Sequence, residues 1–188
     1  MLFVPWRTAG AGGAGGFGLA GRLRDEAARH HAPRGVTSTV RRVLLRGEDF
    51  DDPPPPFRTG SAGLIRLDAE GEFELEERMR ISANSLHALV GHGVVDQLNE
   101  LPLEGTLGEG APSLIRPALV EAARRVFYDA DATSYGGAWE FLVHHDTGPP
   151  ATEYRVAVVN REYQLTLVRL IDILYGAGRR GEGVWLAL

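Results

Sequence analysis

The densest group of side chains capable of acid–base catalysis is the run His144-His145-Asp146. An imidazole exchanges a proton near neutral pH, and a neighbouring carboxylate can orient it. We expect this run in a strand, where adjacent side chains point to opposite faces, so only one of the two histidines can face a pocket. A hydrolase would also need a nucleophile beside that histidine, for which Ser134 and Ser113 are candidates.

The segment before these histidines, DADATSYGGAW at residues 129–139, is the most chemically varied loop that the sequence predicts. Tyr135 and Trp139 are candidate binding residues because aromatic rings offer large contact areas. The sequence has neither the G-x-S-x-G elbow of serine hydrolases nor the H-E-x-x-H motif of zinc enzymes. One hypothesis is therefore a small hydrolase-like enzyme or a ligand-binding protein with a pocket near residues 129–146.

The composition excludes several classes of chemistry. The chain has no cysteine, which rules out disulfides, thiolate nucleophiles, zinc fingers and iron–sulfur ligation. All 20 basic residues are arginine, so Schiff-base chemistry and a P-loop lysine are also excluded. GC-rich coding bias explains the lack of lysine, and avoidance of a lysine-directed modifier is the alternative. His87 and His92 are five residues apart, a spacing that argues against a shared metal. We predict no metal and no cofactor.

The glycine-rich tract near the start matches G-x-G-x-x-G at Gly10, Gly12 and Gly15. Dinucleotide binding would need a strand before the tract, a helix after it and repeated strand–helix alternation beyond. That alternation is missing, so we expect residues 1–35 to be a glycine-rich segment followed by a short helix.

The overall charge and hydropathy set the expected environment. The formal net charge of −5 disfavours binding to nucleic acid, which depends on neutralising phosphates. No apolar run has the roughly 20 residues that a membrane helix needs. The N-terminal stretch lacks the basic residues of a secretory signal. We therefore predict a cytoplasmic protein without membrane contact.

The element around which we expect the fold to form is the stretch from Tyr154 to Gly178. Residues 154–160 read as a buried strand because they are rich in valine. A helix should follow, capped by Asn160 and ended by Gly176, with its apolar stripe packed against that strand. The stripe consists of Tyr163, Leu167, Leu170, Ile171, Leu174 and Tyr175.

The remaining patterns predict mainly strands joined by hairpins. Residues 51–60 contain four consecutive prolines and predict an exposed, stiff polyproline spacer. The helix at 82–100 should kink or break at Gly91 and Gly93. The other expected elements are a strand at 36–46, a hairpin of strands 63–68 and 72–79, a helix at 113–128, a strand at 139–145 and a last strand at 183–188.

These elements predict an α+β domain at residues 36–188. We expect one mixed or mostly antiparallel sheet of about five to six strands, packed by two to three helices. The preferred function is a non-catalytic interaction protein, an adaptor, inhibitor or assembly subunit, whose partner is another protein chain or a second copy. Its candidate binding residues at the C-terminus are Val184, Trp185 and Leu186, which either pair within the sheet or add to a partner.

Overall fold

The computed structural model describes residues 40–46, 52–67, 72–134 and 138–188, all of which belong to one compact unit. These residues form seven strands and four α-helices, which confirms the predicted α+β class. The strands are divided between two sheets, in place of the single sheet expected from the sequence. The glycine-rich tract and the helix expected after it lie outside the described residues.

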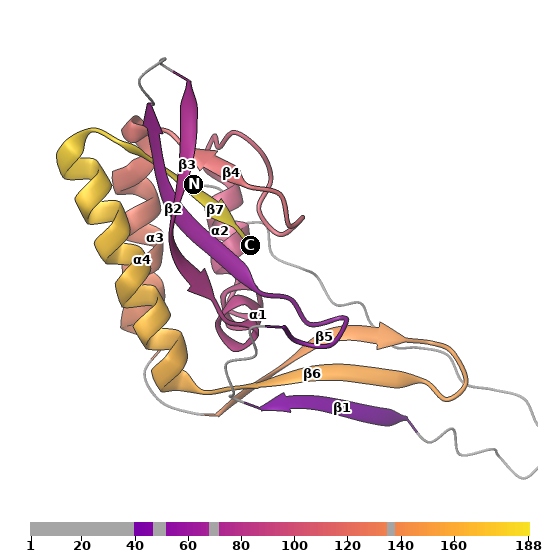
Figure 1. Cartoon of the computed structure of the whole chain (residues 1–188). Helices are drawn as coiled ribbons and strands as arrows, with labels where there is room; N and C mark the ends of the chain where they lie inside the picture. Colours follow the sequence, from indigo (N-terminus) through magenta and orange to yellow (C-terminus); the bar gives the residue numbers. More distant parts are fainter. Residues whose placement is uncertain (1–39, 47–51, 68–71, 135–137) are drawn as a thin grey trace, which may run out of the picture. The chain divides into compact units, whose positions relative to one another are not determined.

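The larger sheet has four antiparallel strands in the order β3-β2-β7-β4 (Figure 1). β2 (Gly60–Leu67) and β3 (Phe73–Ile81) form the predicted hairpin. β7 (Gly183–Ala187) lies between β2 and β4 (Ser113–Ile115), so the C-terminal segment is an internal strand. This outcome is the first of the two that the sequence left open for the C-terminus.

The smaller sheet has three strands in the order β1-β6-β5. β5 (Trp139–Asp146) and β6 (Thr152–Val158) form the expected wide hairpin. β1 (Arg41–Arg46) runs parallel to β6 at its other edge. The first described strand thus pairs with a strand more than a hundred residues later in the chain, which no local pattern could reveal.

The longest helix, α4 (Asn160–Arg180), buries more apolar side chains than any other described helix and packs against α3 (Val120–Thr133). The predicted burial of its apolar stripe is confirmed for Tyr163, Leu167, Leu170, Ile171 and Leu174. The main neighbours differ from the prediction, because α4 packs chiefly against α3, α1, β2 and β7 rather than against the strand that precedes it. That strand, β6, is covered by α1.

Both ends of α4 differ from the prediction. The N-cap position is Val159, and Asn160 is already helical. The helix continues through Gly176 and ends before Gly181, whose φ of 68° is left-handed. A glycine inside a helix is tolerated, whereas a left-handed position strongly favours glycine. Tyr175 lies 54% exposed, outside the buried stripe.

The expected break in the helix at residues 82–100 is confirmed. α1 (Ala83–Gly91) begins at the N-cap Ser82, whose hydroxyl accepts the backbone N–H of Ser85. α2 (Val94–Asn99) starts after Gly93, which has a φ of 72°. α1 is buried along most of its length because it contacts α2, α4, β5 and β6.

The helix expected from residue 113 starts later than predicted. Ser113 belongs to β4 and is buried, so it is not a helix cap. A short 3-10 turn at Pro117–Leu119 follows and leads into α3. Pairing of β4 with β7 explains the difference, since tertiary hydrogen bonds override the local helical pattern.

The proline-rich loop is exposed at Pro54 and Pro55, as the sequence predicted, but it is not an extended polyproline spacer. The backbone N–H of Phe57 donates to the carbonyl of Pro54 (3.0 Å), so this part of the loop forms a turn. The Phe57 ring is 4% exposed and lies edge-on to the rings of His87 and Tyr154. The bulky aromatic residue after the prolines therefore anchors the loop in the core.

We predict that Leu170→Ala lowers the free energy of unfolding by about 2–5 kcal/mol, because it leaves a cavity at a side chain that is 1% exposed. Leu165→Ala is the matched control, since Leu165 lies on the same helix but is 51% exposed, and it should cost less than about 1 kcal/mol. Urea unfolding measures both. Equal losses for the two variants would contradict the packing of α4 described above.

Candidate functional site

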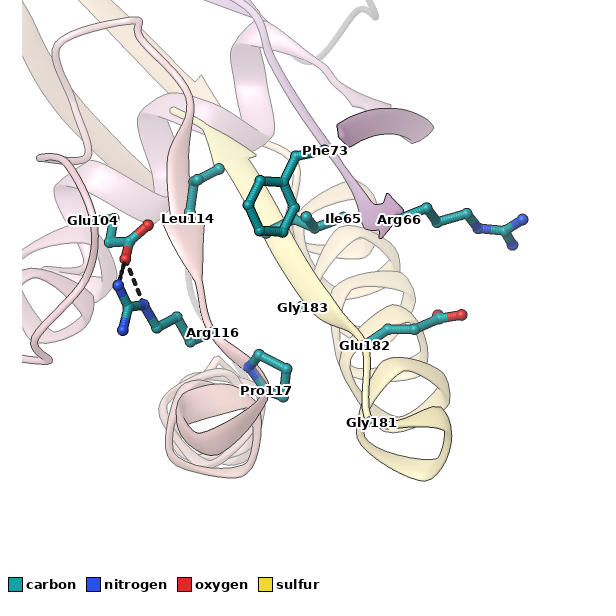
Figure 2. A pocket seen from close by; sticks show the side chains of 10 residues that line it. All are labelled: Ile65, Arg66, Phe73, Glu104, Leu114, Arg116, Pro117, Gly181, Glu182 and Gly183. Atoms are coloured by element: carbon teal, nitrogen blue, oxygen red, sulfur yellow. Dashed lines mark hydrogen bonds and ion pairs between the residues drawn. The ribbon is translucent and has the colours of Figure 1, made fainter. Parts of the chain in front are cut away.

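A groove with a volume of about 690 Å³ lies on the face of the four-stranded sheet that α4 leaves uncovered (Figure 2). Leu64 and Val184 pair across β2 and β7 and point to the α4 side, where both are buried. The next pair, Ile65 and Gly183, therefore faces the opposite side. The groove is lined by Ile65, Arg66, Phe73, Glu104, Leu114, Arg116, Pro117, Gly181, Glu182 and Gly183.

Apolar side chains are exposed on this same face of the sheet. Phe73 is 75% exposed and Leu75 is 43% exposed. Leu75 lies opposite Ile65 in the β2–β3 pairing, so the three apolar side chains share one face. The sequence predicted the alternation of β3 into an apolar and an acidic face, and no helix among the described residues packs extensively on β3.

The charged side chains around the groove are held in ion pairs. Arg116 donates to Glu104 at one rim, as Figure 2 shows. Arg180 donates to Glu182 across 2.7 Å at the other. None of the ten lining residues carries a hydroxyl, thiol or imidazole. The exposed apolar side chains make the groove suited to binding an apolar group.

β3 borders this face and is the outermost strand of its sheet, with β2 as its only strand neighbour in the part of the chain that the structure describes. An outermost strand presents backbone N–H and C=O groups that another extended chain can pair with. The pairing with β2 shifts register between Ala62 and Gly63. Gly63 allows this shift because a Cβ there would lie 2.0 Å from the carbonyl oxygen of Glu76.

The C-terminal residues expected to bind a partner are buried inside the fold. Val184 and Leu186 are fully buried on the α4 side, and Trp185 on the other side is 6% exposed. Since β7 is an internal strand, its backbone is paired on both sides. These three residues contribute to the core and offer no exposed surface to another chain.

The His144-His145-Asp146 run lies in β5, where a bulge decides which side each residue faces. The β5–β6 register shifts at Val143, which places His144 opposite Tyr154 and His145 opposite Glu153. His144 therefore faces α1, close to the Tyr154 ring (5.9 Å between centroids), while His145 faces the other side. The two histidines point to opposite faces, as expected for neighbours in a strand.

The other predicted catalytic residues have local partners of their own. Asp146 accepts a hydrogen bond from the backbone N–H of Gly148 (2.9 Å), which shapes the turn after β5. Ser134 is buried at the end of α3, where its hydroxyl donates to the carbonyl of Asp131 (2.8 Å). Gln164 on α4 donates weakly to the same hydroxyl (3.4 Å). Ser134 thus forms hydrogen bonds with residues of α3 and α4, whereas the ring of His144 lies beside β6.

The predicted binding residue Trp139 belongs to an aromatic cluster around His92, which the sequence analysis did not identify. The ring of His92 stacks on Tyr163 (5.1 Å, 18°) and meets Trp139 and Phe141 edge-on at 5.0 and 4.9 Å. Burial lowers the pKa of His92 and raises that of Tyr163, because each ring loses hydration of its charged form. The cluster packs α1 and α4 against β5. Tyr135 lies outside the described residues.

His87 is the most buried histidine that the structure describes, with 6% of its surface exposed. Its Nε2 accepts the backbone N–H of Arg58 (3.1 Å), so the neutral ring carries its proton on Nδ1. Burial, assisted by the charge of Arg58, lowers the pKa of His87 to about 4. The ring is therefore neutral at physiological pH.

No group of three or more metal-binding side chains occurs within the described ranges. Comparisons with protein-family models, curated proteins and solved structures find no match for this chain. The function is therefore inferred from the geometry of the described residues.

We predict that His87 makes the protein less stable in mild acid. The unfolded ring binds a proton as pH falls through 6.5, whereas the folded ring resists protonation until about 4. The unfolded state thus holds more protons in this window, so the free energy of unfolding falls as the pH falls, by roughly 3 kcal/mol in all. Denaturant unfolding measured between these pH values checks the loss.

His87→Gln, which cannot titrate, should show a smaller pH dependence, and His145→Gln should match the parent protein. An unchanged slope in His87→Gln would refute the assignment.

Proposed function

We propose that this protein is a non-catalytic interaction protein that binds an extended segment of another protein chain along β3. The observation that carries the proposal is the apolar face around Phe73, which is 75% exposed beside a groove of about 690 Å³. Large exposed apolar groups next to a concave surface are typical of sites that bind proteins or ligands. In Figure 2 the ring of Phe73 lies beside Ile65, and Leu114 lies on the other side of the ring.

The free edge of β3 supports an extended partner segment. A strand added beside β3 would form backbone hydrogen bonds, and every second side chain would lie on the uncovered face near Phe73 and Leu75. The groove could then accept a bulky apolar side chain of the segment, since apolar burial supplies the main favourable free energy. Backbone pairing thus gives affinity, and the groove gives selectivity.

The charge of β3 indicates which segments would bind best. Residues 72–77 contain four glutamates, and Glu74 and Glu76 lie on the side of the sheet opposite Phe73. Arg66 and Arg78 already pair with Glu76, both at 2.7 Å, whereas Glu74 is exposed. We infer that the preferred partner alternates apolar residues with basic ones, so that its basic side chains lie beside the glutamates.

A second copy of the chain is the other occupant that this edge could accept, and the experiment below includes it as an outcome. Among the described residues, the hydrogen bonds of Ser134 are with Asp131 and Gln164 and not with a histidine, so they do not support the hydrolase hypothesis. No described helix combines the length and apolar character needed to cross a membrane. A location in the cytoplasm and a lack of affinity for nucleic acid remain predictions from the sequence.

We predict that a fluorescent peptide of alternating leucine and arginine binds the full chain, and that Phe73→Ala weakens binding at least about tenfold, as expected for an aromatic anchor. Fluorescence anisotropy measures both. Tyr175→Ala is the matched control, because Tyr175 is a similarly exposed aromatic residue on α4. A peptide with glutamate in place of arginine should bind less well.

Three outcomes would contradict this proposal. Equal binding by the parent protein and Phe73→Ala would exclude the uncovered face. Equal binding of the two peptides would exclude charge recognition by β3. A concentration-dependent dimer in sedimentation velocity that Phe73→Ala abolishes would make a second copy the occupant, in place of a different protein.

A further inference from the structure

A second groove, with a volume of about 320 Å³, lies between α1 and β5 on the three-stranded sheet. It involves the other sheet and shares no lining residue with the groove around Phe73. Its lining residues are Pro56, Arg58, His87, Val90, Gly91, Phe141, Leu142, Val143 and His144. Two of the histidines discussed above thus meet in one concavity, although 57 positions separate them in the sequence.

Two local features of the chain build this groove. The bulge at Val143 turns His144 toward α1, since regular alternation after Leu142 would point it away. Gly91 lets the ring of Phe141 lie against α1, because a Cβ at position 91 would lie 2.4 Å from that ring. β-Bulges often re-aim a side chain next to a functional site.

Three side chains that line the groove, those of Arg58, His87 and His144, carry hydrogen-bond donors. His87 presents an Nδ1–H because its Nε2 is occupied by the backbone N–H of Arg58. The Arg58 guanidinium donates from Nη1 and Nη2 to the carbonyl of Gly108, both at 3.1 Å, which leaves three of its five N–H groups for other acceptors. His144 adds a third donor. Arg58 is the only residue in the lining with a permanent charge, and no acidic side chain is among the described residues that line the groove.

Aromatic contacts hold the donors in place. Phe57 lies edge-on to His87 (5.9 Å) and to Tyr154 (6.1 Å), and Tyr154 lies next to His144 (5.9 Å). The ring of His87 is additionally fixed by its hydrogen bond to the backbone of residue 58. A site whose donors are positioned before the ligand arrives loses less entropy on binding.

We propose that this groove binds a small organic acid with a single carboxylate and an apolar body. The carboxylate accepts hydrogen bonds from His87, His144 and Arg58, whose positive charge balances its negative one. The apolar body packs against Val90 of α1 and Phe141 of β5, which also line the groove. The volume lies at the lower end of the range for small-molecule sites, which favours a ligand of the size of an aromatic acid.

Benzoate is the probe that tests this proposal on the isotopically labelled full chain. Nuclear magnetic resonance titration should show saturable shifts in α1 and β5. Benzyl alcohol keeps the apolar ring without the charge, and inorganic phosphate keeps the charge without the ring. Both should bind at least about fivefold more weakly than benzoate, because each lacks one of the two kinds of contact.

The test compares variants of two adjacent histidines, His144 and His145, whose side chains point to opposite faces of the sheet. His144→Ala should weaken benzoate binding at least about fivefold, whereas His145→Ala should leave it within about twofold, since His145 faces the other side of the sheet. His144 is exposed, so its loss should not unfold the protein, and thermal melting checks this point. His144→Glu, which sets a like charge against the carboxylate, should abolish binding.

The proposal fails if benzoate gives no saturable shifts up to tens of millimolar, a range that covers weak fragment-sized ligands. It also fails if benzyl alcohol binds as tightly, which would show an apolar site without carboxylate recognition. Tighter binding of phosphate would show an anion site without an apolar body. Equal effects of His144→Ala and His145→Ala would show nonspecific binding. None of these results affects the peptide experiment, which concerns the other sheet.

Discussion

The fold depends on a set of buried hydrogen bonds between the start of α1 and the start of α4. The Asn84 Oδ1 accepts the backbone N–H of Val159 (3.0 Å), at the residue where β6 passes into α4. The hydroxyl of Thr166, about two turns into α4, donates to the hydroxyl of the neighbouring Ser85 (2.9 Å). Asn84 and Ser85 are fully buried, and a buried polar group without a partner costs roughly 1–3 kcal/mol. These contacts therefore fix where the strand ends and in which direction the long helix leaves it.

With the two helices held in this way, each sheet has one face that a helix covers and one face that no described helix covers. α1 covers the three-stranded sheet, and α4 covers the four-stranded sheet. The open face of the three-stranded sheet carries ion pairs, in which Arg155 contacts Glu140 (3.2 Å) and Glu153 (3.0 Å). Such a face is stable in water. The open face of the four-stranded sheet instead presents Phe73 and Leu75, and this contrast is why we assign partner binding to it.

Patterns that depend on neighbouring residues could be read from the sequence. The stripe of α4 repeats at helical spacing, and the second strand of the β2–β3 hairpin alternates apolar and acidic residues, so both were predicted with nearly correct positions. The break between α1 and α2 followed from two glycines, one of which has a positive φ. The candidate histidines of β5 were also placed in a strand correctly. Each of these features arises from the conformational preferences of a few consecutive residues.

Tertiary structure decided everything that depends on which elements meet. The bulge at Val143, which arises from the pairing of β5 with β6, directs His144 toward the groove and His145 away from it. Ser113 lies in a strand because β7 pairs with it, against the helical pattern that follows. Trp185 is buried because β7 became an internal strand. The meeting of His87 with His144 depends on how α1 packs on β5. The sequence by itself determined the elements, since their periodicity is local, whereas their partners are selected by the packing and hydrogen bonding of residues that lie far apart in the chain.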